Sequence, residues 1–126
     1  MRLLLDTHAL VWVLTESHRL SAKAAVALKD RDNVLFVGVG AAYEIDLKRD
    51  VSPDLAQLPF DLDDARRSFD FDWLALTQTH TTRAARLPRI HRDPWDRLMI
   101  AQAIVEDLVI VSVDSQVARY GVPVLW

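Results

Sequence analysis

The sequence of 126 residues has no cysteine, only three glycines and no long hydrophobic run. The absence of cysteine excludes disulfide bonds and cysteine-ligated zinc or iron–sulfur centres. The best apolar stretch, residues 34–43, is far shorter than the roughly 18 residues that a membrane-spanning helix needs. Met-Arg-Leu-Leu-Leu at the N-terminus runs into Asp6 and lacks a signal-peptide pattern. We therefore expect a soluble cytoplasmic protein that does not act at a membrane.

An excess of basic residues is also lacking. Lysine and arginine number 15 and aspartate and glutamate 18, which gives a formal charge of −3. A nucleic-acid-binding protein that depended on net charge would be basic. Any such binding here must depend on local positive charge or on metal ions. The apolar fraction of 51% is enough for one packed core, so we expect a single domain over residues 1–126.

Short apolar runs alternate with helical patterns along the chain. The runs predict five strands, at 3–5, 34–37, 73–76, 108–113 and 122–125. Helices are predicted at 21–30, 41–49, 62–69, 80–87 and 94–107, and a further one begins at 10–14. Runs that are apolar on both faces favour a parallel sheet covered by helices on both sides, which is an α/β fold. Pro123 lies within the last run and cannot donate to a ladder, so that strand should lie at an edge.

Acidic residues stand where strands end. Asp6 and Asp114 directly follow the two best predicted strands, and ligands of open α/β sheets bind at the carboxyl ends of strands. Glu44 lies early in the helix after the second strand, and Asp96 lies in the first turn of the helix 94–107. We expect these four side chains to converge on one edge of the sheet.

Asp114 and Glu44 each also have a structural explanation. Asp114 before Ser115 suits a helix N-cap equally well. Glu44 is spaced to pair with Lys48 one helical turn later, and taken alone that interpretation is the stronger one. Asp6 is hardest to explain structurally, since no turn residue follows it.

The helix 94–107 contains two acids that compete for one role. Asp93 precedes Pro94, which suits the first helical position, so Asp93 fits the N-cap. Asp96 is then free for another function, because a carboxylate at its position favours the helix dipole but is not required there.

Four converging carboxylates would repel one another and need compensating positive charge. Oxygen donors of this kind suit Mg²⁺ or Mn²⁺. Such ions orient a phosphodiester and help to deprotonate an attacking water. The four histidines lack metal-ligand spacing, and we interpret them as surface or packing residues, with His8 and His91 as possible neighbours of the site.

Four segments resemble PIN-domain toxins of the VapC type. They are LLLDTHALVW at 3–12, YEIDLK at 43–48, HRDPWDRLMIAQA at 91–103 and YGVPVLW at 120–126. The resemblance covers almost the whole chain in the right order. It implies a Rossmann-like, three-layer fold and a Mg²⁺- or Mn²⁺-dependent endoribonuclease. It also implies a toxin that forms a homodimer and is neutralised by a VapB-type antitoxin.

The resemblance assigns roles to individual positions. The catalytic acids fall on Asp6, Glu44, Asp96 and Asp114, of which Asp6, Asp96 and Asp114 are the expected metal ligands. Thr7 is expected to hold Asp6 in place. The acid of the motif Asp-x-x-x-Ile-Ala falls on Asp96, in agreement with the capping argument.

The chain departs from the family pattern at several positions, none of them a carboxylate. Tyr43 replaces a tryptophan, and Asp46 stands where a small apolar residue is usual. Gly38 and Gly40 replace small polar residues before the glutamate-bearing helix.

Basic residues gather between positions 83 and 97, and from these we predict Arg92 and Arg97 as RNA contacts, with solvated surface arginines as the equal alternative. Arg97 follows Asp96 directly and is expected to reach the site. Trp12 and Trp95 are interpreted as core or interface residues. A groove near Trp12 and residues 43–60 is expected to receive the antitoxin, and an exposed Met99 to contribute to a dimer.

Rival families fit less well. A response-regulator receiver would have paired acids after the first strand and a lysine after the last. A haloacid-dehalogenase-type phosphatase would have an aspartate at position 8, which is His8. The remaining alternative is a catalytically inactive PIN-like domain that binds RNA or protein.

Overall fold

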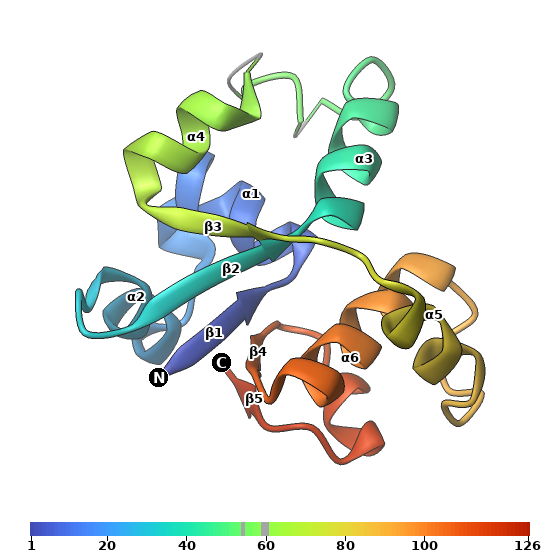
Figure 1. Cartoon of the computed structure of the whole chain (residues 1–126). Helices are drawn as coiled ribbons and strands as arrows, with labels where there is room; N and C mark the ends of the chain where they lie inside the picture. Colours follow the sequence, from blue (N-terminus) through green and yellow to red (C-terminus); the bar gives the residue numbers. More distant parts are fainter. Residues whose placement is uncertain (54, 59–60) are drawn as a thin grey trace.

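The sheet at the centre of the molecule has five strands, all parallel. The computed structural model describes residues 1–53, 55–58 and 61–126 (Figure 1). The strands are β1 (Arg2–Leu5), β2 (Val34–Gly38), β3 (Phe71–Leu74), β4 (Val109–Val111) and β5 (Val124–Leu125). Their order across the sheet is β3-β2-β1-β4-β5. This arrangement confirms the predicted α/β fold with a parallel sheet.

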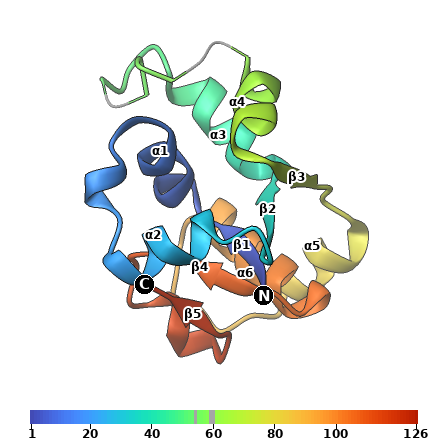
Figure 2. The same cartoon turned by 90° about the vertical axis from the view of Figure 1, so that its left-hand side faces the viewer.

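Helices cover both faces of this sheet. They are α1 (Thr7–Thr15), α2 (Ala22–Lys29), α3 (Val39–Lys48), α4 (Leu62–Phe69), α5 (Gln78–Ala85) and α6 (Pro94–Glu106), with short 3-10 turns η1 (Ser17–Arg19) and η2 (Val117–Tyr120). One apolar core joins α1, α2 and α4 to one face, and a second joins α5, α6 and η2 to the other. Figures 1 and 2 show α5 and α6 together on the side away from α1 and α2. The predicted three-layer architecture is therefore confirmed.

β1 is the middle strand of the sheet, and its side chains enter both apolar cores. Leu3 and Leu5 enter the core under α1 and α2, whereas Leu4 enters the core under α6. This follows from the two-residue period of a strand. All three leucines are at most 1% exposed, which explains the unbroken apolar run in the sequence.

Several predicted boundaries differ from those of the structure, two of them for identifiable reasons. The third strand begins at Phe71, two residues earlier than predicted, because Asp70 takes a left-handed conformation with φ 53° and ends α4 abruptly. α1 begins at Thr7 because Asp6 caps it. The prediction that the Pro123-containing segment lies at an edge was right, since β5 is the last strand and Pro123 directly precedes it.

The topology brings several segments to one end of the sheet. β1 and β4 are neighbours, so the residues after them emerge side by side. α3 follows β2 directly and packs against α6. In the described part of the chain, no helix is long and apolar enough to cross a bilayer.

Candidate active site

Asp6 is fixed at the junction of β1 and α1. Its Oδ1 accepts a hydrogen bond of 2.6 Å from the backbone N–H of Ala9, which makes Asp6 the N-cap of α1. This capping role was not predicted, although aspartate is one of the preferred N-cap residues. Burial raises the pKa of the Asp6 carboxyl, although hydrogen bonds from Ser112 and Ala9 oppose the rise. Thr7 was expected to hold Asp6 in place, but among the described residues no hydrogen bond joins the two. Ser112 is the side chain that bonds the Asp6 carboxylate instead.

Asp114 is held by a histidine that belongs to another segment. The Nε2 of His91 lies 2.6 Å from Oδ2 of Asp114, and its Nδ1 lies 2.9 Å from the hydroxyl of Tyr120. Because that hydroxyl accepts a hydrogen bond from the backbone N–H of His91, its own hydrogen is free to reach Nδ1. In this arrangement Nε2 of His91 donates to Asp114.

The environment of Asp114 favours its charged form. Partial burial opposes ionisation, but hydrogen bonds from His91 and from the backbone N–H of Gln116 outweigh it and lower the pKa of Asp114. The bond from Gln116 also shows that Asp114 stabilises the turn before η2. Its structural and functional interpretations are therefore compatible.

Asp96 is an acid of the site whose pKa is raised well above its ordinary value. Asp93 caps α6, accepting from the N–H of Trp95 at 2.8 Å, and Pro94 takes the first helical position, both as predicted. Asp96 follows in the first turn. Burial and the neighbouring charge of Asp93 raise the pKa of the Asp96 carboxyl to about 6, with smaller contributions from two other acids, Glu44 and Asp114.

Glu44 faces the same region from α3. The Nζ of Lys48 lies 3.3 Å from Oε2 of Glu44, so the expected i,i+4 pair forms. The Glu44 side chain is 13% exposed, whereas that of Lys48 is 51% exposed. Lys48 therefore places one positive charge at the rim of an acidic site.

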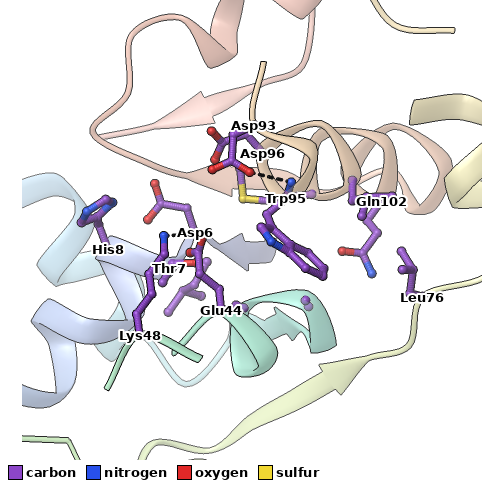
Figure 3. Close-up of a pocket in the computed structure, with 16 residues that line it drawn as sticks. Asp6, Thr7, His8, Glu44, Lys48, Leu76, Asp93, Trp95, Asp96 and Gln102 are labelled. Carbon is purple, nitrogen blue, oxygen red and sulfur yellow. Dashed lines mark hydrogen bonds and ion pairs between the residues drawn. The ribbon is translucent and has the colours of Figure 1, made fainter. Parts of the chain in front are cut away.

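A cavity of about 160 Å³ joins these elements (Figure 3). Asp6, Glu44 and Asp96 line it, together with Thr7, His8, Lys48 and Asp93. Asp114 is not one of the lining residues, but its charge raises the pKa of both Asp6 and Asp96. Three of the four predicted acids thus share one cavity, and the fourth acts on it electrostatically.

The chemistry of these donors fits Mg²⁺ or Mn²⁺. All four are carboxylates, which hard divalent cations prefer, and the charges of neighbouring acids add to the burial that raises the pKa of Asp96. Among the described residues, however, no three acidic or histidine side chains are arranged to hold an ion. A cation bound here would have to draw the carboxylates together.

Arg97 was expected to reach the acids, but its side chain is bonded elsewhere. Its guanidinium donates to the carbonyl oxygens of Ala84, Leu87 and Pro88, at 2.8 to 2.9 Å. It therefore ties the end of α5 to α6. A separate groove is lined by Arg89, His91, Arg92 and Arg97, and the side chains of Arg89 and Arg92 are exposed.

Several residues near the site were not predicted to act there. His91 was named as a possible neighbour of the site, and its position in the segment 91–103 was the available signal. Ser112 gave no signal, because it reaches Asp6 through tertiary contacts. Tyr120 and Gln102 belong to the segments 120–126 and 91–103, but no role was assigned to either residue, although Gln102 lines the cavity.

One family model matches this chain, and several solved structures share its fold. The model of the PIN domain matches residues 3–123. The VapBC2 structure from Rickettsia felis, bound to a DNA fragment from its promoter, has a TM-score of 0.72 at 15% identity, covering 98% of this chain and 97% of that one. FitAcB from Neisseria gonorrhoeae has a TM-score of 0.66 at 17% identity, covering 97% of this chain and 95% of that one. A toxin–antitoxin complex from Klebsiella pneumoniae has a TM-score of 0.61 at 15% identity, covering 91% of this chain and 88% of that one. A comparison with curated proteins finds no match.

Proposed function

The chain belongs to the PIN-domain family, and we propose that it is a Mg²⁺- or Mn²⁺-dependent endoribonuclease, the toxin of a VapBC-type toxin–antitoxin pair. PIN domains are generally nucleases, and the similar structures come from toxin–antitoxin complexes. The observation that carries the proposal is the cluster of acids at the carboxyl end of the sheet, with the raised pKa of Asp96. We propose that it acts on RNA in the cytoplasm.

Asp6, Asp96 and Asp114 would hold the metal, with Glu44 completing the site. A bound divalent cation supplies positive charge that orients a phosphodiester and lowers the pKa of the attacking water. Glu44 is positioned to accept the proton of that water, because its carboxylate lines the cavity. Lys48 contributes a positive charge beside Glu44.

Two contacts keep the outer acids in place. The N-cap bond from Ala9 fixes the direction of the Asp6 carboxylate. His91 orients Asp114 by its Nε2 donor and is itself held by Tyr120. Partners of this kind around a metal ligand typically change metal affinity or activity about 10- to 100-fold when removed. Thr7 lines the cavity without a hydrogen bond to Asp6, and its proposed supporting role rests on that position alone.

The RNA backbone would approach along the arginine groove. His91 contacts Asp114 and also lines this groove, so the groove adjoins the acids. Arg92 and Arg89 present exposed guanidinium groups there, which suits phosphate contacts without base reading. Arg97 shapes the groove while it remains bonded to the backbone.

An antitoxin would dock on the outer face of α3. Val39, Tyr43 and Leu47 recur every fourth residue and are 38%, 55% and 61% exposed, which is a pattern of helix-in-groove or helix-on-helix contacts. This stripe includes part of the segment expected to receive the antitoxin. Copurification of the chain with the product of a neighbouring gene, and its loss in Leu47→Asp, tests this contact.

We also propose a homodimer. Met99 was expected to be exposed for this contact, but it lines the cavity and is half-buried. In the C-terminal half Val105 and Val113 are instead exposed, at 37% and 47%. Light scattering of the isolated chain is the test, and a monomer at all concentrations contradicts the proposal.

Cleavage of total cellular RNA in Mg²⁺, Mn²⁺ or EDTA tests the nuclease. The protein should yield discrete fragments only with metal. Asp6→Asn and Asp96→Asn should cut at least about 100-fold more slowly, since even partners of metal ligands are worth 10- to 100-fold. Asparagine retains the N-cap bond of Asp6, so the fold should survive.

Asp64→Asn is the matched control, because Asp64 stands in the first turn of α4 as Asp96 does in α6. It should cleave as the unmodified protein does. A folded, antitoxin-free protein that binds RNA but never cuts it would instead support an inactive PIN-like binding domain.

A further inference from the structure

Gln102 is a buried polar side chain whose acceptor is unused. It is 3% exposed and lies on α6, where it lines the cavity. Its Nε2 donates to the carbonyls of Leu74 and Ala75, at 3.3 and 3.4 Å. Within the described residues, no group donates to its Oε1. Oε1 is not among the fully buried unpartnered atoms of the described residues, so it keeps access to the cavity and is available to accept from a ligand donor there.

The backbone opposite Gln102 keeps this acceptor open. A Cβ added to Gly38 would lie 2.6 Å from Oε1 of Gln102, so the end of the Gln102 side chain would have to shift. A Cβ added to Gly40 would lie 3.0 Å from the indole of Trp95. The two glycines therefore leave room for the side chains that form the inner end of the cavity.

Helix α6 connects this inner end to the acids. Asp96, Met99 and Gln102 follow at intervals of three residues, and all three line the cavity. At 1.5 Å per residue, Gln102 lies about 9 Å along the helix from Asp96. In Figure 3 the indole of Trp95 lies between the acids and Gln102. A phosphate at the acids and a ring near Gln102 are thus separated on the scale of a single nucleotide.

The space available suits a single ring. The cavity measures about 160 Å³, similar to an engineered cavity of about 150 Å³ that binds benzene. Trp95 supplies a flat aromatic wall, and Leu76 and Met99 supply apolar contacts. A single-ring base with an amino group satisfies both the size and the unused acceptor. Cytosine presents an N4 amino donor where uracil presents a carbonyl oxygen.

We propose that the inner end of the cavity is a nucleobase subsite that selects an amino-bearing pyrimidine through Oε1 of Gln102. The base belongs to the nucleotide whose phosphate lies at the carboxylates, so the subsite rests on the proposed nuclease function. Uracil would place its carbonyl against Oε1, acceptor to acceptor, and would bind less well. Gln102 is a specificity-determining residue and takes no part in the bond-breaking step.

Binding of mononucleotides tests the subsite without requiring cleavage. The probes are CMP, UMP and ribose 5-phosphate, titrated into the full chain with Mg²⁺ and followed by calorimetry and NMR. CMP should bind about 2- to 10-fold more tightly than UMP, the range expected for one hydrogen bond. Only CMP should shift the side-chain amide signals of Gln102 strongly.

Three variants locate the effect. Gln102→Met preserves size but removes the acceptor, and it should make the affinities for CMP and UMP equal. Gly38→Ala intrudes on Oε1 and should reduce the same preference without touching an acid. Gln78→Met is the control, because Gln78 is exposed on α5 and bonds only Thr82. It should retain the preference. Circular dichroism confirms that each variant is folded.

The outcomes separate this proposal from the nuclease. If the protein binds CMP and UMP equally, or if Gln102→Met preserves a preference for CMP, the subsite is wrong even when RNA is cleaved. If CMP is preferred and Gln102→Met abolishes the preference, the subsite stands even when no RNA is cleaved under any condition.

Discussion

Replacing Asp96 by asparagine should stabilise the metal-free protein at neutral pH. The pKa of Asp96 rises from 3.8 to about 6 because folding buries the carboxyl beside Asp93 and other acids. The folded protein therefore binds more protons than the unfolded chain between about pH 4 and pH 6. Its stability falls as the pH rises through that window, and the full penalty is present above pH 6.

The size of this penalty follows from the pKa. At 1.36 kcal/mol per pKa unit, the rise corresponds to about 3 kcal/mol as an upper bound. Asp96 is only half-buried, so solvent screening reduces the figure to roughly 1–2 kcal/mol. Asparagine loses the favourable interaction of a carboxylate with the helix dipole, roughly 0.3–1 kcal/mol. The net gain is about 1 kcal/mol, or about 4 °C in Tm for a domain of this size.

Thermal unfolding in EDTA from pH 4 to pH 8 measures the effect. Asp96→Asn should exceed the unmodified protein in Tm at pH 7 and match it or fall below it at pH 4. Asp64→Asn, at the equivalent position of α4, loses a helix-dipole contact and its pair with Arg67, so it should gain nothing. Excess Mg²⁺ should raise the Tm of the unmodified protein more than that of Asp96→Asn.

One result refutes the reasoning. If Asp96→Asn is no more stable than the unmodified protein at pH 7, and the difference is the same at every pH, then Asp96 carries no charge penalty. The electrostatic argument for a cation site would fall with it.

Three further substitutions test other contacts. Arg97→Met should lower the free energy of unfolding by roughly 2–4 kcal/mol in denaturant titrations, because three carbonyls lose a charged donor; an unchanged midpoint would contradict its structural role. Arg92→Met should leave Tm unchanged but lower the salt slope of RNA binding by about 0.7, the value for one phosphate contact on a single strand; an unchanged slope would remove Arg92 from the RNA path. His91→Phe should raise the pKa of Asp114 in a carboxyl NMR titration, and a static value would show that His91 does not stabilise the charge.

Local chemistry made much of the fold predictable. The leucines of β1 are apolar on consecutive positions because both faces of a central strand are buried, and this pattern is visible in the sequence. Asp93 and Pro94 predict the start of α6 because capping involves residues only two or three positions apart. The third strand was displaced by two residues, since the left-handed turn at Asp70 gave no recognisable signal.

The acids of the site could be predicted from the sequence, but the side chains that contact them in the folded protein could not. Asp6 and Asp114 stand at strand ends, which the sequence shows. That they act on each other depends on β4 pairing with β1, a choice made by packing across the whole sheet. Arg97 was expected to contact RNA because it follows Asp96 in the sequence. Adjacency along the chain does not fix the direction of a side chain, and the Arg97 guanidinium bonds backbone carbonyls instead.

The sequence by itself determined the periodicity of strands and helices, the N-cap of α6 and the position of each acid along the chain. These features depend on residues within one or two turns of one another. Only the tertiary structure decided that His91 holds Asp114 and that Oε1 of Gln102 stays open opposite Gly38. Contacts of this kind join side chains that are distant in sequence, and their geometry depends on how the helices and the sheet pack together.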